Sequence, residues 1–368
     1  MNGLLTLMLL TVLVPLGVMV TAVPFLTRKT ESFGVSIEER HWHDPEIRGM
    51  RRAYALGTGS FAALAILAGL AASAFLDENS LDWLLPALVG VMLAAHATFY
   101  LRFHFRMKAL KERRGLVSSE QQLVVDTGFH REKRAFSNWW LIPHLVVAAA
   151  TAAVCLIFYD RFPEQIVMQY DFQGNPSRVV DKSYATVLMP AVIQLLLVLV
   201  FRIVNFSIAS SKQQLDAAHP QKSLRQNMIF RRQWSAFLLF SGFLLVLAIA
   251  LLPLQMLLQF PPSVTIALLL AVVVVILLGV LTLGFMTGQG GSRILIREAA
   301  GAPAGTVNRD DDRYWKLGVF YFNPEDPALF LEKRFGVGWT INWARPAAWA
   351  LVFGPVALIV AVSLALDS

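Results

Sequence analysis

The sequence has 368 residues, of which 56% are hydrophobic and only 15% are charged. Soluble domains average roughly 45–50% apolar and about 25% charged residues, so this composition excludes an ordinary soluble domain. Apolar runs of about twenty residues, each long enough to cross a hydrocarbon core of roughly 30 Å, predict a multi-pass membrane protein.

Eight apolar segments are long enough to be transmembrane helices, which predicts an all-α polytopic bundle. They are 4–26, 55–76, 82–101, 137–159, 185–205, 234–258, 263–286 and 346–366. The first segment lacks a basic start and is followed by Arg28 and Lys29, so we expect it to remain in place rather than to be cleaved as a signal peptide. The single cysteine, Cys155, excludes an intrachain disulfide and a cysteine metal cluster.

Lysine and arginine gather in alternate loops. The loops 27–54, 102–136, 206–233 and 287–345, together with Arg202, hold 29 of the 32. The opposite side has only Arg161, Arg178 and Lys182. The positive-inside bias therefore predicts that the four basic loops are cytoplasmic and that both termini are extracytoplasmic, at the plasma membrane. Topology and anionic lipids at the cytoplasmic face explain the net charge of +7, and we expect no nucleic-acid partner.

Three short motifs in these loops have weak chemical signatures. The pair His41 and His43 could bind zinc or copper, but no further ligand is evident nearby. The glycine-rich stretch 287–293, TGQGGSR, lacks the Gly-Lys-Ser/Thr of a phosphate loop and is expected to be a flexible helix end. The stretch 309–313, RDDDR, is typical of a solvated linker. We expect no metal, no cofactor and no complete catalytic constellation.

Polar residues inside the apolar segments are functional candidates, because an ionisable or amide group is costly in a membrane. The candidates are His96, His144, Gln194 and Arg202. A polar site among spans three to five, lined by His96 or Gln194, would indicate a transporter or a membrane enzyme. Interhelical hydrogen bonds for the first three residues, and snorkelling for Arg202, are the alternative.

The polar segment between spans four and five has the pattern of a β-hairpin. From Glu164 to Gln173, one set of alternate residues is mostly apolar and the other mostly polar, which is typical of a half-buried strand. Gly174–Pro176 predicts a turn and Ser177–Asp181 a returning strand. By the charge argument this hairpin is extracytoplasmic.

The last cytoplasmic loop predicts a second hairpin-like module. Trp315–Phe322 is aromatic and β-branched enough for a strand, Asn323–Pro327 is a strong turn signal, and Ala328–Phe335 would return. Trp339 and Trp343 are expected to seat the module at the membrane interface. The candidate contact residues of this module are Tyr314, Trp315, Phe320, Phe322, Pro324, Asp326, Arg334, Trp339 and Trp343.

The outward segment FPEQIVMQYDFQGNPSRVVDK resembles the signature loop of a bacterial membrane domain of unknown function. That domain also forms the N-terminal part of the SdpI-like immunity proteins against the sporulation-delay toxin. The family pattern is matched at Pro163, Ile166, Gly174 and Lys182, whereas Val167, Gln169 and Ser177 replace its usual Pro, His and Asp. The resemblance, with these departures, favours a contact surface over metal or proton chemistry. The candidate contact residues are Pro163, Ile166, Gln169, Tyr170, Phe172, Gly174 and Lys182.

The segment from DDRYWKLGVFYFNPEDP to KRFGVGWTINWARPAAW resembles a second small domain of unknown function that often ends such proteins. The first four spans, with FGVSIEERHWHDPEIRGMRRAY, resemble long family members of Gram-positive bacteria. The predicted organisation is 1–136, an N-terminal membrane region; 137–210, the outward-loop domain; 211–286, two further spans; 287–345, the cytoplasmic module; and 346–368, the last span.

These features favour a non-enzymatic membrane protein of an immunity-like or envelope-sensing type. The outward hairpin would contact an extracytoplasmic peptide or envelope component, and the cytoplasmic module would contact lipid or a regulator protein. A transporter or membrane enzyme, and a structural or assembly factor, are the alternative hypotheses.

Overall fold

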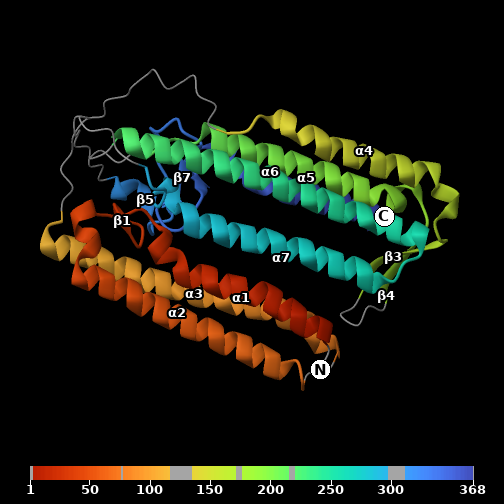
Figure 1. Cartoon of the computed structure of the whole chain (residues 1–368), viewed down its shortest axis with the longest axis horizontal. Coiled ribbons are helices and arrows are strands. Elements are labelled where there is room, and N and C mark those ends of the chain that lie inside the picture. The colour runs from red at the N-terminus through yellow and green to blue at the C-terminus, as the bar shows by residue number, and fades with distance from the viewer. Residues whose placement is uncertain are drawn as a thin grey trace.

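The computed structural model describes residues 3–75, 78–116, 135–170, 176–214, 220–296 and 311–367. Long helices lie side by side along one direction and form an elongated bundle (Figure 1). The sheets within the described residues are short, antiparallel and two-stranded. The prediction of an all-α polytopic bundle is confirmed.

The helices follow the apolar segments of the sequence. They are α1 (Gly3–Leu26), α2 (Pro45–Ala72), α3 (Glu78–Arg114), α4 (Ile142–Ile157), α5 (Tyr184–Ser210), α6 (Pro220–Leu258), α7 (Pro262–Thr287) and α8 (Pro346–Asp367). Within the described residues, α1 to α7 are each long and apolar enough to cross a membrane. The last helix, α8, has 22 residues and coincides with the eighth predicted segment.

The bundle consists of two three-helix groups joined by α7. Helices α1, α2 and α3 pack together, α4, α5 and α6 pack together, and α7 lies against α1 and α6. Small residues allow close packing in the first group, where a side-chain carbon added at Gly69 would lie 2.5 Å from Leu88. Ala65, Gly69 and Ser73 recur every four residues along span two, and such small side chains let membrane helices approach one another.

Two helices are much longer than a membrane crossing requires. Helix α3 has 37 residues and α6 has 39, whereas about 20 suffice to cross the hydrocarbon. Helix α3 continues past its predicted span, as far as Arg114, through the basic segment RFHFRMKALKERR. Helix α6 begins at Pro220, well before the predicted span 234–258. Proline is well tolerated in the first turn of a helix, so it suits this starting position. Both extensions lie at the same end of the bundle as β5 and β7 (Figure 1).

The four hairpins lie at opposite ends of the bundle. They are β1 (Glu31–Ser32) with β2 (Val35–Ser36), β3 (Gln165–Tyr170) with β4 (Pro176–Asp181), β5 (Trp315–Lys316) with β6 (Phe320–Tyr321), and β7 (Phe330–Glu332) with β8 (Trp339–Ile341). Strands β1, β5 and β7 lie at one end, and β3 and β4 at the other, where both termini also lie (Figure 1). The β3–β4 hairpin thus has the strands that the sequence predicts between spans four and five.

The C-terminal module contains two hairpins where the sequence predicts one. The predicted strand Trp315–Phe322 folds back on itself at Leu317 and Gly318, whose φ angles are 52° and 71°. A side-chain carbon at Gly318 would lie 2.7 Å from Tyr100 Oη of α3, so only glycine allows this turn to approach the helix. Asn323–Pro327 consequently links two hairpins instead of turning within one.

Candidate functional site

The β3–β4 hairpin is seated on the second helix group by one apolar face. Ile166 is buried, and Met168 and Val180 pack beside it. The surface beneath them comes from α4, α5, α6 and the loop after α4, with Cys155, Phe162, Val187, Met256 and Leu257. This is the face that the alternation of residues predicts, and its burial fixes the hairpin against the end of the bundle.

The opposite face and the edges of this hairpin are open. Gln165, Gln169 and Arg178 are exposed, and the side chain of Val179 is 44% exposed. Lys182 N donates to Glu164 O at 2.8 Å. This bond makes Glu164 and Lys182 a hydrogen-bonded pair. Hydrogen-bonded and non-bonded pairs alternate in an antiparallel ladder, so the facing pair Val167 and Val179 is a non-bonded pair. The N–H groups of these two residues are therefore directed outward, away from the partner strand. Unpaired N–H groups along a strand edge are suited to pairing with another extended chain.

Lys182 holds the base of the hairpin together. Its Nζ donates to Glu164 Oε1 at 2.6 Å and to Phe162 O at 3.2 Å, and it lies 5.5 Å from the centre of the Tyr159 ring. The hydrogen bond to Glu164 raises the pKa of Lys182. Lys182 therefore acts within the hairpin, whereas Pro163 and Gln169 are exposed. Of the other predicted contact residues, Phe172, Gly174 and the side chain of Tyr170 lie outside the described residues.

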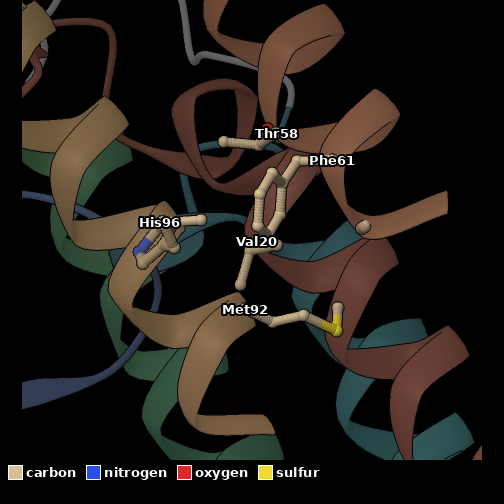
Figure 2. Close-up of a pocket in the computed structure, with 7 residues that line it drawn as sticks. Val20, Thr58, Phe61, Met92 and His96 are labelled. Atoms are coloured by element: carbon tan, nitrogen blue, oxygen red, sulfur yellow. The ribbon is translucent and has the colours of Figure 1, made fainter. Parts of the chain in front are cut away.

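His96 lies on α3 beside a small pocket in the first helix group. Its Nδ1 is 2.6 Å from Tyr54 Oη, and Tyr54 Oη also donates to Val20 O at 3.2 Å. Figure 2 shows the pocket, which Thr58, Phe61 and other residues of α1, α2 and α3 line. It has room for about one water molecule.

Gln194 and His144 belong to the second helix group. Gln194 Nε2 donates to Thr151 Oγ1 at 3.2 Å and to Val246 O at 2.8 Å, which ties α5 to α4 and α6. His144 Nε2 is 3.0 Å from Leu239 O of α6. The structure thus places Gln194 among α4, α5 and α6 and His96 among α1, α2 and α3, and does not bring them together. Arg202 is exposed on α5, about two turns before that helix ends at Ser210, and its long side chain can snorkel toward the interface.

A buried charge cluster joins both helix groups to the C-terminal module. The Glu332 cluster consists of Glu332 on β7, Arg28 after α1, and Arg231 and Asn227 on α6. Arg28 and Arg231 both form ion pairs with Glu332, the second at 3.0 Å. Asn227 Nδ2 donates to Glu332 Oε1 at 2.5 Å. Arg231 and Glu332 are fully buried, so each needs the other to stay charged there.

A second cluster lies between the module, α3 and the β1–β2 hairpin. The Arg334 cluster consists of Arg334, Asp311, Asp312, Lys111 and Ser36. Arg334 pairs with both aspartates, and Lys111 Nζ donates to Asp312 Oδ2 at 2.7 Å. Ser36 Oγ donates to Asp312 Oδ1 at 2.9 Å. Burial alone would raise the pKa of Asp312, but Arg334 and Lys111 hold it below its ordinary value. Asp311 and Asp312 of the RDDDR motif are consequently part of a packed ion-pair cluster and not of a solvated linker, whereas Arg309 and Asp310 lie outside the described residues.

The glycine-rich stretch after α7 is a docking point for the module. Gln289 is fully buried; its Nε2 donates to Lys333 O and Gly338 O at 2.9 Å each, and Gly338 N donates to its Oε1 at 2.7 Å. The expectation of a merely flexible helix end is wrong here, because one side chain satisfies three backbone groups of the β7–β8 turn.

The predicted contact residues of the module divide between its interior and its surface. Trp315 and Asp326 are buried, and Asp326 accepts hydrogen bonds from Tyr321 Oη at 2.8 Å and Lys212 Nζ at 2.5 Å. Trp339 packs on Phe230 of α6, with ring centres 5.2 Å apart. The residues left at least partly exposed are Tyr314, Phe320, Phe322, Pro324 and Trp343.

Sequence reasoning missed the inward role of Arg28, Arg231, Gln289 and Glu332. Arg231 lies just before a predicted span, where basic residues are common, and Glu332 is followed by Lys333 and Arg334. Neither position therefore signals an inward role. Their pairing could not be inferred, because the partners are far apart in the sequence.

The fold and these sites define the chain as a multi-pass helical membrane protein with β-hairpins at both ends of the bundle. Residues 146–193 match the model of a domain of unknown function, DUF1648. Residues 324–349 match the model of a family of unknown function, DUF5808. The first match includes the β3–β4 hairpin with parts of α4 and α5, and the second includes β7, β8 and the start of α8. No curated protein and no solved structure matches the chain.

Proposed function

We propose that this membrane protein is of an immunity-like or envelope-sensing type and that its β3–β4 hairpin contacts an extracytoplasmic peptide. In this proposal the hairpin and both termini are outside the cell and the C-terminal module is in the cytoplasm. The distribution of Lys and Arg supports this orientation. The arrangement in Figure 1, with β3–β4 and both termini at one end, is consistent with it.

The observation that carries this proposal is the open hairpin edge. One face of β3–β4 is buried, and the N–H group of Val179 is directed outward at the β4 edge, where it has no ladder partner. An extended peptide could add to this edge as a further strand, with main-chain hydrogen bonds supplying affinity and the exposed side chains supplying selectivity.

A proline scan of the edge tests the contact. Val179→Pro removes one outward N–H and no ladder hydrogen bond. The hairpin should therefore stay folded, while the protection of the cells against the peptide is lost. Ile166→Pro breaks the ladder and is the unfolding control. Cells carrying each variant are challenged with envelope-active peptides at equal protein levels. Unchanged survival with Val179→Pro would count against strand addition.

The orientation is tested separately. Gln169→Cys and Lys316→Cys are labelled in intact cells with a membrane-impermeant maleimide, and the native Cys155 is buried. The proposal expects labelling at 169 and none at 316 until the cells are opened. The reverse pattern would invert the proposed topology.

We also propose a structural role for the C-terminal module, which is to hold the helices together at this end of the bundle. In the Glu332 and Arg334 clusters, and at Gln289, polar groups of the module bind residues of the helices and of the loops that join them. Exposed Phe320 and Phe322 are the surface that it would offer to lipid or to a cytoplasmic regulator protein. A transporter or enzyme site is less favoured, because His96 and Gln194 lie in different helix groups and the pocket beside His96 is small.

A further inference from the structure

Glu31 is a buried carboxyl group on the β1–β2 hairpin, and only 6% of its surface is exposed. The hairpin turns tightly at Phe33 and Gly34, which have φ angles of 49° and 75°. The turn is held against α3, where His104 Nδ1 lies 2.8 Å from Phe33 O, and against the module, where Arg334 donates to Gly34 O at 3.4 Å. The carboxyl group is therefore enclosed where the N-terminal and C-terminal parts of the chain meet.

The cations around Glu31 are already committed to other carboxylates. Arg334 pairs with Asp311 and Asp312, Lys111 pairs with Asp312, and Arg28 pairs with Glu332. No donor among the described residues reaches the buried Oε2 of Glu31, and Arg334 Nε has no hydrogen-bond partner there either. Glu31 is thus a third carboxyl group beside a guanidinium that two aspartates already bind.

We propose that Glu31 is a proton-binding site whose occupancy controls how firmly the β1–β2 hairpin holds the C-terminal module. A neutral carboxyl group can remain buried at modest cost, but an ionised one without its own donor cannot. Ionisation would also place a third negative charge beside Asp311 and Asp312, and like charges at short range repel. Release of the proton should therefore loosen the hairpin from the module.

The direction of the pH dependence follows from the surroundings of Glu31. Burial raises its pKa to about 7, Asp311 and Asp312 act in the same direction, and Arg28 and Arg334 act against it. A raised pKa means that the docked state keeps a proton that the opened state releases. Docking is therefore firmest in acid and weakens as the pH rises through neutrality. The pKa of Glu31 is about 7 in the docked state against 4.5 when the hairpin is opened. This difference changes the equilibrium constant for docking roughly 300-fold over the full titration, and about tenfold between pH 6 and pH 8.

Hydrogen–deuterium exchange of the full-length protein in lipid nanodiscs tests this inference. Peptides covering 29–37 and 330–340 are followed between pH 6 and pH 8, with rates corrected for the intrinsic pH dependence of exchange. Protection of both peptides should fall about tenfold in the wild-type protein. Glu31→Gln mimics the protonated form and should keep its protection constant within about twofold. Glu39→Gln, at a surface ion pair with Lys29, is the control and should behave as wild type.

A second variant keeps the test decisive if Glu31→Gln does not fold. Asp311→Asn removes one neighbouring negative charge and frees part of Arg334 for Glu31, so both effects lower the pH at which protection falls. A wild-type protein with constant protection across this pH range would overturn the inference. So would an unchanged pH profile in Glu31→Gln, or an unshifted midpoint in Asp311→Asn.

Discussion

Substitution of Glu332 by glutamine is the sharpest test of how the two helix groups are held to the module. The change preserves the shape of the side chain and one acceptor oxygen but removes its charge. Arg28 and Arg231 then lose their shared carboxylate, and Arg231 is fully buried. The perturbation therefore leaves a buried guanidinium without a counter-charge.

The size of the effect depends on the hydrogen bonds that Arg231 retains in the Glu332→Gln protein. It still donates to Ile208 O at 3.0 Å, to Ser211 O at 2.9 Å and to Asn227 Oδ1 at 2.6 Å. Breaking a buried ion pair typically costs about 3–5 kcal/mol, and these remaining bonds place the expected loss near the lower end, about 3 kcal/mol. At roughly 2–4 °C per kcal/mol, the apparent melting temperature should fall by about 6–12 °C.

Thermal unfolding of the purified full-length protein in detergent measures this change. Glu325→Gln, an exposed position in the same module, is the matched control and should shift the melting temperature by less than about 2 °C, as surface substitutions do. Arg231→Gln in the Glu332→Gln background should cost less than Arg231→Gln alone, because the two residues are coupled. A fall of less than about 2 °C for a folded Glu332→Gln protein would refute the reasoning. It would mean that the desolvation cost of the cluster cancels its attraction.

Three further outcomes are expected from the same geometry. Val179→Pro should keep amide-exchange protection of the β3–β4 ladder while abolishing peptide binding; loss of the ladder itself, as in Ile166→Pro, would contradict the assigned register. Gln289→Ala should cost about 2–3 kcal/mol, since it orphans three backbone groups, and should speed amide exchange at the β7–β8 turn, whereas an unchanged rate would speak against the docking role. Gly34→Ala should lower the melting temperature, because its new carbon would lie 2.6 Å from Gly318 O and Tyr100 Oη at a φ of 75°. Gly49→Ala, which meets nothing within 4 Å in a helix, should raise it slightly, and equal effects at the two positions would show that the β1–β2 turn is not tightly packed.

The helices and the β3–β4 hairpin could be predicted because their signals are local. A run of about twenty apolar residues satisfies the length and solvation needs of a membrane helix by itself. Alternation from Gln165 to Gln169 likewise encodes which face of β3 is buried. The module was predicted less well, since Leu317 and Gly318 turn the chain in the middle of an apparent strand. Leucine rarely adopts a positive φ, so the isolated Gly318 was the one local signal of a turn at that point.

The sequence by itself determined the number and positions of the apolar segments that form helices, the asymmetry of positive charge between the loops, and the presence of the β3–β4 hairpin. Each of these follows from interactions between neighbouring residues and the surrounding lipid or water. Only the tertiary structure decided that Arg28 and Arg231 share Glu332, and that Glu31 is enclosed beside Arg334. These contacts join residues about 100 to 300 positions apart, and the energy of a buried charge depends on the partners that the whole fold brings to it.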